Sequence, residues 1–445
     1  MINYTKFLLV ILLIGGAMGA SAQELSTTSS PYSRFGLGLM TDQTLPQTRA
    51  MGGIAAGVNE IGGFSNINLI NPSSYSNIRL TTIDIGINAN VSLLSQSGVS
   101  SNDPNTNVRL SHVAFGIPVT KRSALSFGLV PYSEVGYNYT QSAVHKAATN
   151  PYNNAYGSDT TMNTIYSGEG GLSKAYFGYG FGIGKHLKLG ANVSYIFGNI
   201  RNYSNIEIPD LYGAVDTRVE ESNKIGGINY DYGAQYTIDL SDTKHLTLGY
   251  SASASSKLNS ASAYYVSQYT YDSKGNQNNA VDSLVSSQNP RSKIVLPLTN
   301  HFGFTYQNDN KFLVGADYIN SKWSSLSIDG VNQGLRNSQS FRVGGQITPD
   351  INALHNYMAR MDYRLGFIYD QSYLNVNGTN INEYAATFGF GFPLPRNNNA
   401  FYKINFSAEV GKRGTLQNGL IRENYINLHL SFLLNDLWFV KYKFE

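Results

Sequence analysis

The segment Tyr425-Ile-Asn-Leu-His-Leu-Ser-Phe432 alternates strictly between polar and apolar side chains. In an extended chain, the apolar residues at positions 426, 428, 430 and 432 share one face, and the polar residues at 427, 429 and 431 share the other. Trp438 and Phe439 follow, so the segment leads into an aromatic-rich stretch. This pattern predicts the closing strand of an outer-membrane β-barrel, in which lipid covers one face and the polar lumen the other.

Segments with the same alternation recur from Leu80 onward. In the first, apolar residues at odd-numbered positions from Ile83 to Leu93 alternate with polar or small residues. The others are expected at residues 107–119, 122–141, 171–184, 186–206, 220–239, 245–271, 290–307, 311–328, 338–348, 358–375, 381–393, 400–411 and 421–433. They make about 14 strands, an even number as in bacterial single-chain barrels. The fold class predicted for residues 80–445 is therefore all-β, a 14-stranded antiparallel transmembrane β-barrel.

The connections between these segments fall into two alternating classes. The short class includes Thr120-Lys121 and Lys185-His186, and the longer class includes residues 95–106, 142–170 and 272–289. Outer-membrane barrels have short periplasmic turns and longer external loops. With an even number of strands, both chain termini are expected on the periplasmic side of the outer membrane of a Gram-negative bacterium.

The composition agrees with a barrel but does not require one. The chain has 32 Tyr, 21 Phe and 44 Gly among 445 residues, and 14% of its residues are charged, against about 25% in soluble proteins. A secreted array of β-sandwiches would have similar values, so composition leaves that alternative open. The net charge is +3, and no basic cluster interleaved with aromatics indicates nucleic-acid binding.

Residues 1–22 have the features of a signal peptide. Lys6 precedes an apolar run from Phe7 to Ile14, and Ala20-Ser-Ala22 matches an A-x-A cleavage site. The run is short for a membrane helix, so a retained anchor is the weaker alternative. The chain has no cysteine, which excludes disulfides, thiolate metal sites and a lipidated N-terminal cysteine. No cofactor is expected.

Residues 23–79 lack the alternation of barrel strands and are rich in glycine. A short helix is expected near residues 48–58, where apolar residues recur at helical spacing although glycines weaken the helix. A segment of this size predicts a small plug, or hatch, inside the barrel. Two strands carry inward-facing glycines: Gly178, Gly180, Gly182, Gly184, Gly389 and Gly391. These glycines either relieve strain in a curved sheet or leave room for the hatch or a ligand.

The hatch segment also contains short motifs of a known family. The order Gly36-Leu-Gly38, Arg49-Ala-Met-Gly-Gly53 and Asn71-Pro72, just before the first strand, resembles the N-terminal hatch of FadL-type outer-membrane channels for long-chain fatty acids and other hydrophobic compounds. The resemblance implies 14 strands, a hatch in the lumen, and an inward kink of the third strand that opens a side exit. The hatch residues that it implies are Gly36, Gly38, Met51, Gly52, Gly53, Asn71 and Pro72.

The third predicted strand contains a proline in its middle. It reads Phe127-Gly-Leu-Val-Pro-Tyr-Ser-Glu-Val-Gly-Tyr137, with Pro131 at the centre. Proline cannot donate a backbone hydrogen bond, and a closed barrel has no edge strand to accommodate it. A bulge or gap is therefore expected. It is either a local irregularity or a lateral opening, in which Gly128 and Gly136 supply the bend.

An enzymatic site is not predicted. The alternation directs His429 toward the lumen, and it places Asp84 and Glu409 on the two neighbouring strands. A luminal polar network that holds the hatch explains these three residues better than catalysis does, with ligand contact as the other alternative. His112 and His301 are expected at strand ends. The sequence has no G-x-S-x-G or His-x-x-x-His motif.

Together these patterns predict a passive channel for hydrophobic, fatty-acid-like molecules, gated by the hatch and with a lateral exit at the third strand. The expected partners are a hydrophobic ligand and outer-membrane lipid. The alternative is a non-transporting barrel that is a subunit or docking scaffold of an envelope secretion or assembly machine, with an envelope protein as its partner. The polar long loops favour this alternative, since a capture site for fatty acids needs an apolar patch. A polar pore ranks third, because the lumen is expected to be filled.

Overall fold

The structure is a computed structural model that describes residues 30–97, 104–145, 159–209, 214–271, 277–278, 282–328, 330–395 and 400–438, without the side chains of residues 282–291. The predicted signal peptide lies outside the described residues. Within these ranges, no helix has both the length and the apolar character needed to cross a membrane.

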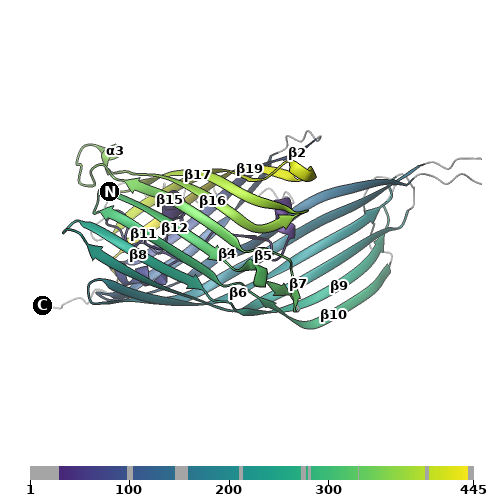
Figure 1. The fold of residues 1–445 in the computed structure, drawn as a ribbon, viewed down its shortest axis with the longest axis horizontal. Coiled ribbons are helices and arrows are strands. Elements are labelled where there is room, and N and C mark those ends of the chain that lie inside the picture. The colour runs from purple at the N-terminus through teal and green to yellow at the C-terminus, as the bar shows by residue number, and fades with distance from the viewer. Residues whose placement is uncertain are drawn as a thin grey trace, which may run out of the picture.

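The strands form one antiparallel sheet that closes on itself (Figure 1). Its strands are β2 (Thr81–Gln96), β3 (Asn105–Thr120), β4 (Ser123–His145), β5 (Thr160–Ile183), β6 (Leu187–Glu207), β7 (Asp216–Asp239), β8 (Lys244–Ser253), β9 (Lys257–Tyr269), β10 (Asp282–Val295), β11 (Thr299–Asn308), β12 (Phe312–Ser321), β15 (Ser338–Ile347), β16 (Asp362–Val376), β17 (Thr379–Pro393), β18 (Phe401–Gly414) and β19 (Ile421–Asp436). β8 and β9 both pair with β7 and form one barrel strand. β10 and β11 form the next one. β19 pairs with β2, so the predicted closed, 14-stranded antiparallel barrel is confirmed.

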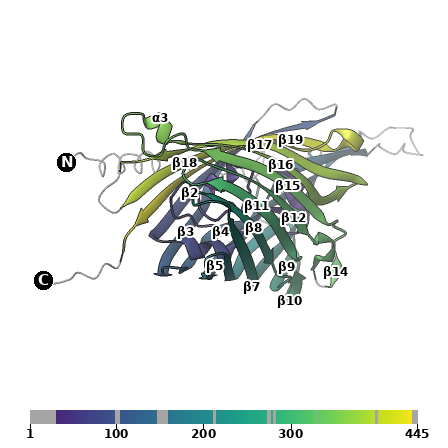
Figure 2. The same cartoon turned by 60° about the vertical axis from the view of Figure 1, so that its left-hand side comes forward.

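The shorter elements lie inside the barrel or at its ends. They are β1 (Leu39–Met40), β13 (Ser327–Ile328), β14 (Val331–Asn332), α2 (Pro46–Arg49), α3 (Tyr357–Arg360), η1 (Pro31–Arg34), η2 (Pro72–Asn77), η3 (Trp323–Ser325) and η4 (Gln417–Gly419). α3 lies at one end of the barrel, which we call the turn end (Figure 2). At the opposite loop end, β5, β6, β9 and β10 extend beyond β15–β17 (Figure 1).

In the structure, two loops and one helix are shorter than the sequence predicts. The β4–β5 ladder continues to the pair His145 with Thr160, and β10 begins at Asp282, so much of the loops expected at 142–170 and 272–289 is strand. Polar residues dominate both faces of the β4 and β5 extensions, so hydrophobic alternation cannot reveal them. The helix expected at 48–58 is only the four-residue α2. It ends before Gly52 and Gly53, whose positive φ values are incompatible with a right-handed helix.

The two faces of the wall differ in the way that the alternation predicts. On β5, Phe177, Tyr179 and Phe181 are exposed on the outer surface, while Gly178 and Gly180 are buried. Aromatic rings also contact one another across strands on the outside, as in the Tyr318–Phe341 and Tyr369–Tyr384 pairs (5.0 and 4.8 Å between centroids). The exterior therefore has the apolar, aromatic character that a lipid environment requires.

Residues 30–79 pack against the inner surface of the wall, and we call them the luminal segment. Several inward glycines lie directly against its backbone. A Cβ atom at Gly366 would lie 2.1 Å from Gly52 N, and one at Gly249 would lie 1.9 Å from Ala56 O. Of the glycines singled out in the sequence, Gly178, Gly180 and Gly389 contact the luminal segment, Gly391 contacts wall side chains, and Gly182 and Gly184 have no such close neighbour.

Candidate functional site

The backbone ladder between β3 and β4 ends partway along both strands. Its last pair is Val113 with Leu129, although both strands continue for several residues beyond it. We call the unpaired region beyond this point the β3–β4 break. On its other side β4 stays paired with β5, but the register shifts between Pro131 and Ser133. The irregularity predicted from Pro131 is therefore present.

The luminal segment occupies part of the edge that β4 presents at this break. β1 pairs antiparallel with Ser133 and Glu134 of β4, and Thr41 N donates a hydrogen bond to Tyr132 O at 3.0 Å. The side chains of Arg109 and Glu134 form an ion pair that joins β3 to β4. Unpaired backbone groups are costly in a membrane. The bonds to β1 therefore stabilise β4 where β3 no longer pairs with it.

Gly128 and Gly136 lie on either side of the irregular part of β4. A Cβ atom at Gly128 would lie 2.2 Å from Val113 O, so the last pair of the ladder needs glycine. Gly136 N donates to Ser33 Oγ at 3.0 Å, and its carbonyl accepts from Ser30 N at 2.9 Å. The two glycines thus mark the end of the ladder and the attachment of η1.

Four residues of the predicted hatch motif have positive φ angles: Gly36, Gly38, Gly52 and Gly53. Two of them also lie directly against the backbone of the wall. A Cβ atom at Gly38 would lie 2.4 Å from Glu134 O, and one at Gly52 would lie 2.6 Å from Val343 O. At these two positions glycine is needed for both its backbone conformation and its size.

Met51 and Asn71 hold the middle and the end of the luminal segment. Met51 is fully buried in a cluster with Ile54, Val58, Ile61 and Leu313. Asn71 Nδ2 donates to Ala56 O at 2.7 Å, and Asn71 Oδ1 accepts from Ser73 N at 3.2 Å, which caps η2 where it begins at Pro72. These bonds connect the helical turns of the segment to one another.

Arg49, the last residue of α2, is the centre of a buried ion-pair network. Its Nε lies 2.5 Å from Glu409 Oε2, and it also pairs with Asp42. Asp42 lies 2.6 Å from Arg342 as well. Burial alone would raise the pKa of the Asp42 carboxyl, but Arg342 and Arg49 outweigh burial and hold this pKa well below its usual range. The stability contributed by Asp42 is therefore present above its unfolded pKa of about 3.9 and is lost only as pH falls through the lower folded value.

A second group of ion pairs fastens the start of the luminal segment. Arg413 Nε lies 2.8 Å from Glu383 Oε2, and its Nη1 lies 3.3 Å from Glu423 Oε2. Glu423 accepts a hydrogen bond from Ser30 Oγ at 2.8 Å. The Tyr425 hydroxyl bonds both to Glu383 and to the carboxylate that pairs with α2, so it joins the two groups.

No hydrogen bond among the described residues joins the three members of the predicted luminal network. Asp84 accepts from Gln47 Nε2 at 3.1 Å and lies 2.9 Å from His112 Nε2. Glu409 belongs to the ion-pair network of α2. His429 is on the inner side, but its Nε2 is buried with no hydrogen-bond partner in the described structure. Asp84 and Glu409 thus contact the luminal segment separately.

The strand-end position expected for His112 is wrong, and His301 lies near the start of β11 only because β10 and β11 divide one barrel strand. His112 is 1% exposed and lies against Asp84. The β2–β3 register shifts beside it, between Gly86 and Ile87, and this irregularity cannot be read from an alternation pattern. His301 lies within the β8–β11 ladder and lines the cavity described below.

Asp317 of β12 binds the backbone of the luminal segment. Its Oδ2 accepts hydrogen bonds from Ala55 N at 2.7 Å and Ala56 N at 2.8 Å. Replacing Asp317 with Asn should weaken this attachment by about 1–3 kcal/mol, because a carboxylate is a stronger acceptor than an amide. Hydrogen exchange should become faster at these two amides and stay unchanged on β6. Equal exchange in both proteins would show that the charge of Asp317 contributes nothing to the attachment.

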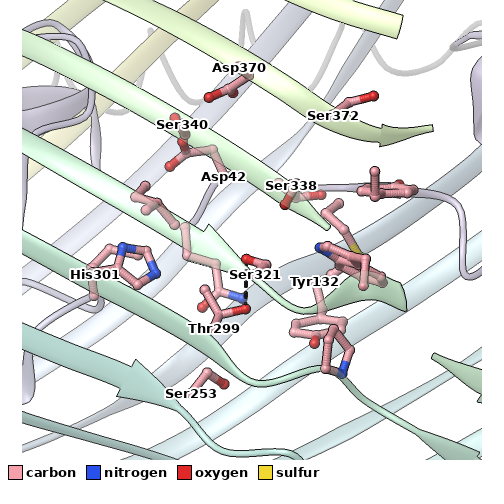
Figure 3. Close-up of a pocket in the computed structure, with 18 of the residues that line it drawn as sticks. Asp42, Tyr132, Ser253, Thr299, His301, Ser321, Ser338, Ser340, Asp370 and Ser372 are labelled. Atoms are coloured by element: carbon pink, nitrogen blue, oxygen red, sulfur yellow. Dashed lines mark hydrogen bonds between the residues drawn. The ribbon is translucent and has the colours of Figure 1, made fainter. Parts of the chain in front are cut away.

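A cavity of about 300 Å³ lies between the luminal segment and the wall. Its wall side is rich in hydroxyl groups, those of Ser253, Thr299, Ser321, Ser338, Ser340 and Ser372 (Figure 3). Asp370 and His301 come from the same wall, while Asp42 and the residues of β1 come from the segment. The cavity therefore has charged, hydroxylated and apolar surfaces together.

Comparison with models of protein families identifies the family of this chain. The family model named BamG matches residues 1–445, the full length of the sequence.

The chain belongs to the BamG family.

No curated protein shows a significant match to it.

Several solved structures share the fold of this BamG-family chain. The toluene transporter TbuX of Ralstonia pickettii has a TM-score of 0.55 at 15% identity, over 88% of this chain and 98% of its own. A FadL homologue of Pseudomonas aeruginosa has a TM-score of 0.56 at 14% identity, over 90% and 100%. The toluene transporter TodX of Pseudomonas putida has a TM-score of 0.53 at 12% identity, over 89% and 99%. At such identities the likeness shows the fold alone. The resemblance to FadL-type channels therefore holds for the fold, while the matching family model is BamG.

Sequence reasoning missed most of the charged residues inside this BamG-family barrel. They include Arg342, Glu383, Arg413, Glu423 and the Lys174–Asp231 pair, which is 2.7 Å apart. A signal was present, because the alternation in each strand already assigns these side chains to the inner face. Most of their partners could not be found in this way, since pairs such as Arg342–Asp42 join segments far apart in the sequence, whereas Arg413 and Glu423 are opposed across one hairpin.

Proposed function

We propose that this barrel is a passive outer-membrane channel for hydrophobic small molecules, and that the solute leaves sideways through the β3–β4 break. The observation that carries this proposal is the end of the ladder at Val113 and Leu129. Two residues of β1 cover part of the β4 edge at the break, and one ion pair joins β3 to β4 there. The similar structures named as toluene transporters agree with such a role.

In this proposal the luminal segment is the gate. Solute enters from the loop end, reaches the cavity behind β1, and passes into the membrane when β1 separates from β4. The turn end then faces the periplasm. The ion pair between Arg109 and Glu134 would also have to separate for the break to open. Transfer of each solute methylene from water to an apolar environment supplies about 0.8 kcal/mol, so no external energy source is needed.

A disulfide between β1 and β4 should close the channel. Met40 and Ser133 are opposite each other in the antiparallel pairing, a position where Cα atoms lie about 4.5–5.5 Å apart and a disulfide fits. The chain has no other cysteine. Uptake of radiolabelled toluene or oleate should fall to the level of cells lacking the protein when Met40→Cys/Ser133→Cys is oxidised, and it should recover on reduction.

The matched control is Tyr306→Cys/Val314→Cys, a directly opposed pair in the β11–β12 ladder away from the break. This disulfide should leave uptake unchanged. Unchanged uptake through the oxidised Met40–Ser133 variant would refute lateral exit at the break. If cells with the unmodified barrel take up no more solute than cells lacking the protein, the channel proposal itself is refuted.

A docking subunit of an envelope machine is the second candidate. The ion-pair networks and the hydroxyl-rich cavity favour it, because they suit a permanently packed lumen better than the passage of purely apolar solutes. Native mass spectrometry of the protein released from its own membrane separates the two. A stoichiometric protein partner with an empty cavity supports the docking subunit, and a small apolar adduct without such a partner supports the channel.

A further inference from the structure

We infer that the cavity binds amphiphiles with an uncharged head group that carries several hydroxyl groups, as in an alkyl glycoside. The inference names the solute class of the channel and so rests on the proposed function. It is carried by a row of hydroxyl side chains on the wall, which we call the hydroxyl row, by the pairing of the cationic side chains, and by the apolar side chains that line the cavity.

The hydroxyl row crosses four neighbouring barrel strands. Ser253, Thr299, Ser321 and Ser338 are directly opposed from β8 through β11 and β12 to β15. All four line the cavity, and the hydrogen bond from Thr299 Oγ1 to Ser321 Oγ is 2.9 Å long (Figure 3). The wall thus presents regularly spaced hydroxyl groups to one side of the cavity.

The internal bonds of this row leave hydrogen-bond donors available. Ser253 Oγ accepts from Asn229 Nδ2 at 3.0 Å, and Ser321 Oγ accepts from its neighbour on β11. Ser340 Oγ accepts from Arg342 Nε at 3.1 Å. Because the oxygens of Ser253 and Ser321 are acceptors in these bonds, their O–H groups can donate to a ligand. Asp370 Oδ1 is buried with no hydrogen-bond partner in the described part of the chain, and it supplies an acceptor.

The cationic side chains around the cavity are already neutralised by carboxylates. Arg342 lies 2.6 Å from Asp42, and Lys174 lies 2.7 Å from Asp231. Arg413 has two carboxylate partners, and Arg49 also has two. An anionic head group would have to displace one of these partners, and it would also meet Asp370. The cavity therefore disfavours a fatty-acid carboxylate and suits a neutral head group.

Apolar side chains also line the cavity, and some of them belong to residues at the β3–β4 break. Trp323 stacks on Tyr373 with 4.5 Å between ring centroids, and both line the cavity together with Leu39, Met40 and Tyr132. β1 and Tyr132 also lie at the irregular part of β4. An apolar tail packed on these side chains would lie beside the break while the head group bonds to the hydroxyl row. The volume of about 300 Å³ is at the small end of the usual range for ligand sites, about 300–1,000 Å³, and suits a compact head group.

Tryptophan fluorescence provides a direct test, because the chain has only two tryptophans, Trp323 and Trp438. The Trp438→Phe variant leaves Trp323 as the reporter inside the cavity. In lipid nanodiscs, octyl glucoside below its micellar concentration should give a saturating change in emission. Octanoate and glucose at the same concentrations should give at least about tenfold weaker responses.

Variants of the wall provide the second measurement. Adding Ser321→Ala to the reporter protein should raise the dissociation constant for octyl glucoside about tenfold, the effect of losing about 1.4 kcal/mol. Ser407→Ala is the matched control, since Ser407 is also a buried wall serine but does not line the cavity. This control should leave the constant unchanged.

The inference would be overturned by octanoate binding as well as or better than octyl glucoside, or by equal effects of the two serine variants. An equal response to free glucose would also overturn it, because the tail would then contribute nothing. Failure of the channel proposal is seen separately in the uptake assay. Toluene uptake without any Trp323 response would refute only the ligand class, and a Trp323 response without uptake would refute transport.

Discussion

Replacing Arg49 with Met should detach α2 from the wall while the barrel strands stay folded. Arg49 is buried against Glu409 and Asp42, and Asp42 retains Arg342 as a partner. Glu409, whose side chain is 1% exposed, would lose its cationic partner. Removing one side of a buried ion pair costs about 3–5 kcal/mol, because the remaining charge stays buried without compensation. This loss of free energy is a large share of the free energy that a short segment can gain by packing against the wall.

Limited digestion with proteinase K measures this effect. The luminal segment should be cleaved in the Arg49→Met protein and protected in the parent, while both barrels keep their folded mobility in unheated gels. Arg49→Met/Glu409→Gln should regain much of the protection, since the uncompensated charge is gone. Arg201→Met is the control, because the Arg201–Glu169 pair is exposed and 3.5 Å apart and should contribute about 0–1 kcal/mol. Protection of the segment in Arg49→Met would mean that the network does not hold α2.

Replacing Gly366 with Ala should displace the middle of the luminal segment. The new Cβ atom would lie 2.1 Å from Gly52 N and 2.3 Å from the Met51 carbonyl carbon. Both neighbours are backbone atoms, so no side-chain rotation can relieve the overlap. Overpacking of this kind costs about 1–3 kcal/mol or more. We expect faster hydrogen exchange from Met51 to Gly57.

Gly182→Ala is the matched control for this variant. Gly182 belongs to the same class of strand glycines, but its added Cβ would have no neighbour closer than 3.7 Å. Its exchange pattern should equal that of the parent protein. An unchanged pattern in Gly366→Ala would show that the segment shifts at no cost, and the proposed gate would then be loosely packed in its closed state.

The alternation of residues identified the barrel, its strand number and most strand positions, because lipid on one side and a polar lumen on the other impose a period of two. It did not show that the β4–β5 ladder continues to His145, where both faces of the strands are polar. The proline in the third strand predicted a local irregularity, and the register shift after Pro131 agrees with it.

The candidate site was harder to predict than the fold. Asp84 and Glu409 could be assigned to the inner face, but their contacts Gln47 and Arg49 lie in a segment without periodicity. The β3–β4 break depends on where two strands separate, which is a property of the whole barrel. For the same reason, the occupation of the β4 edge by β1 could not be read from the two residues of β1 themselves.

The pairing of β19 with β2 sets the order in which this molecule can assemble. The seam joins the two ends of the barrel sequence, as in the hydrogen bond of 2.8 Å between Thr82 and Asn435, which are 353 positions apart. Such distant pairings form slowly, because closing a long loop costs conformational entropy before any native contact offsets this cost. Until β19 arrives, both seam strands expose open edges that can pair with other chains. Newly made chains are therefore expected to pass through an aggregation-prone intermediate until β19 pairs with β2.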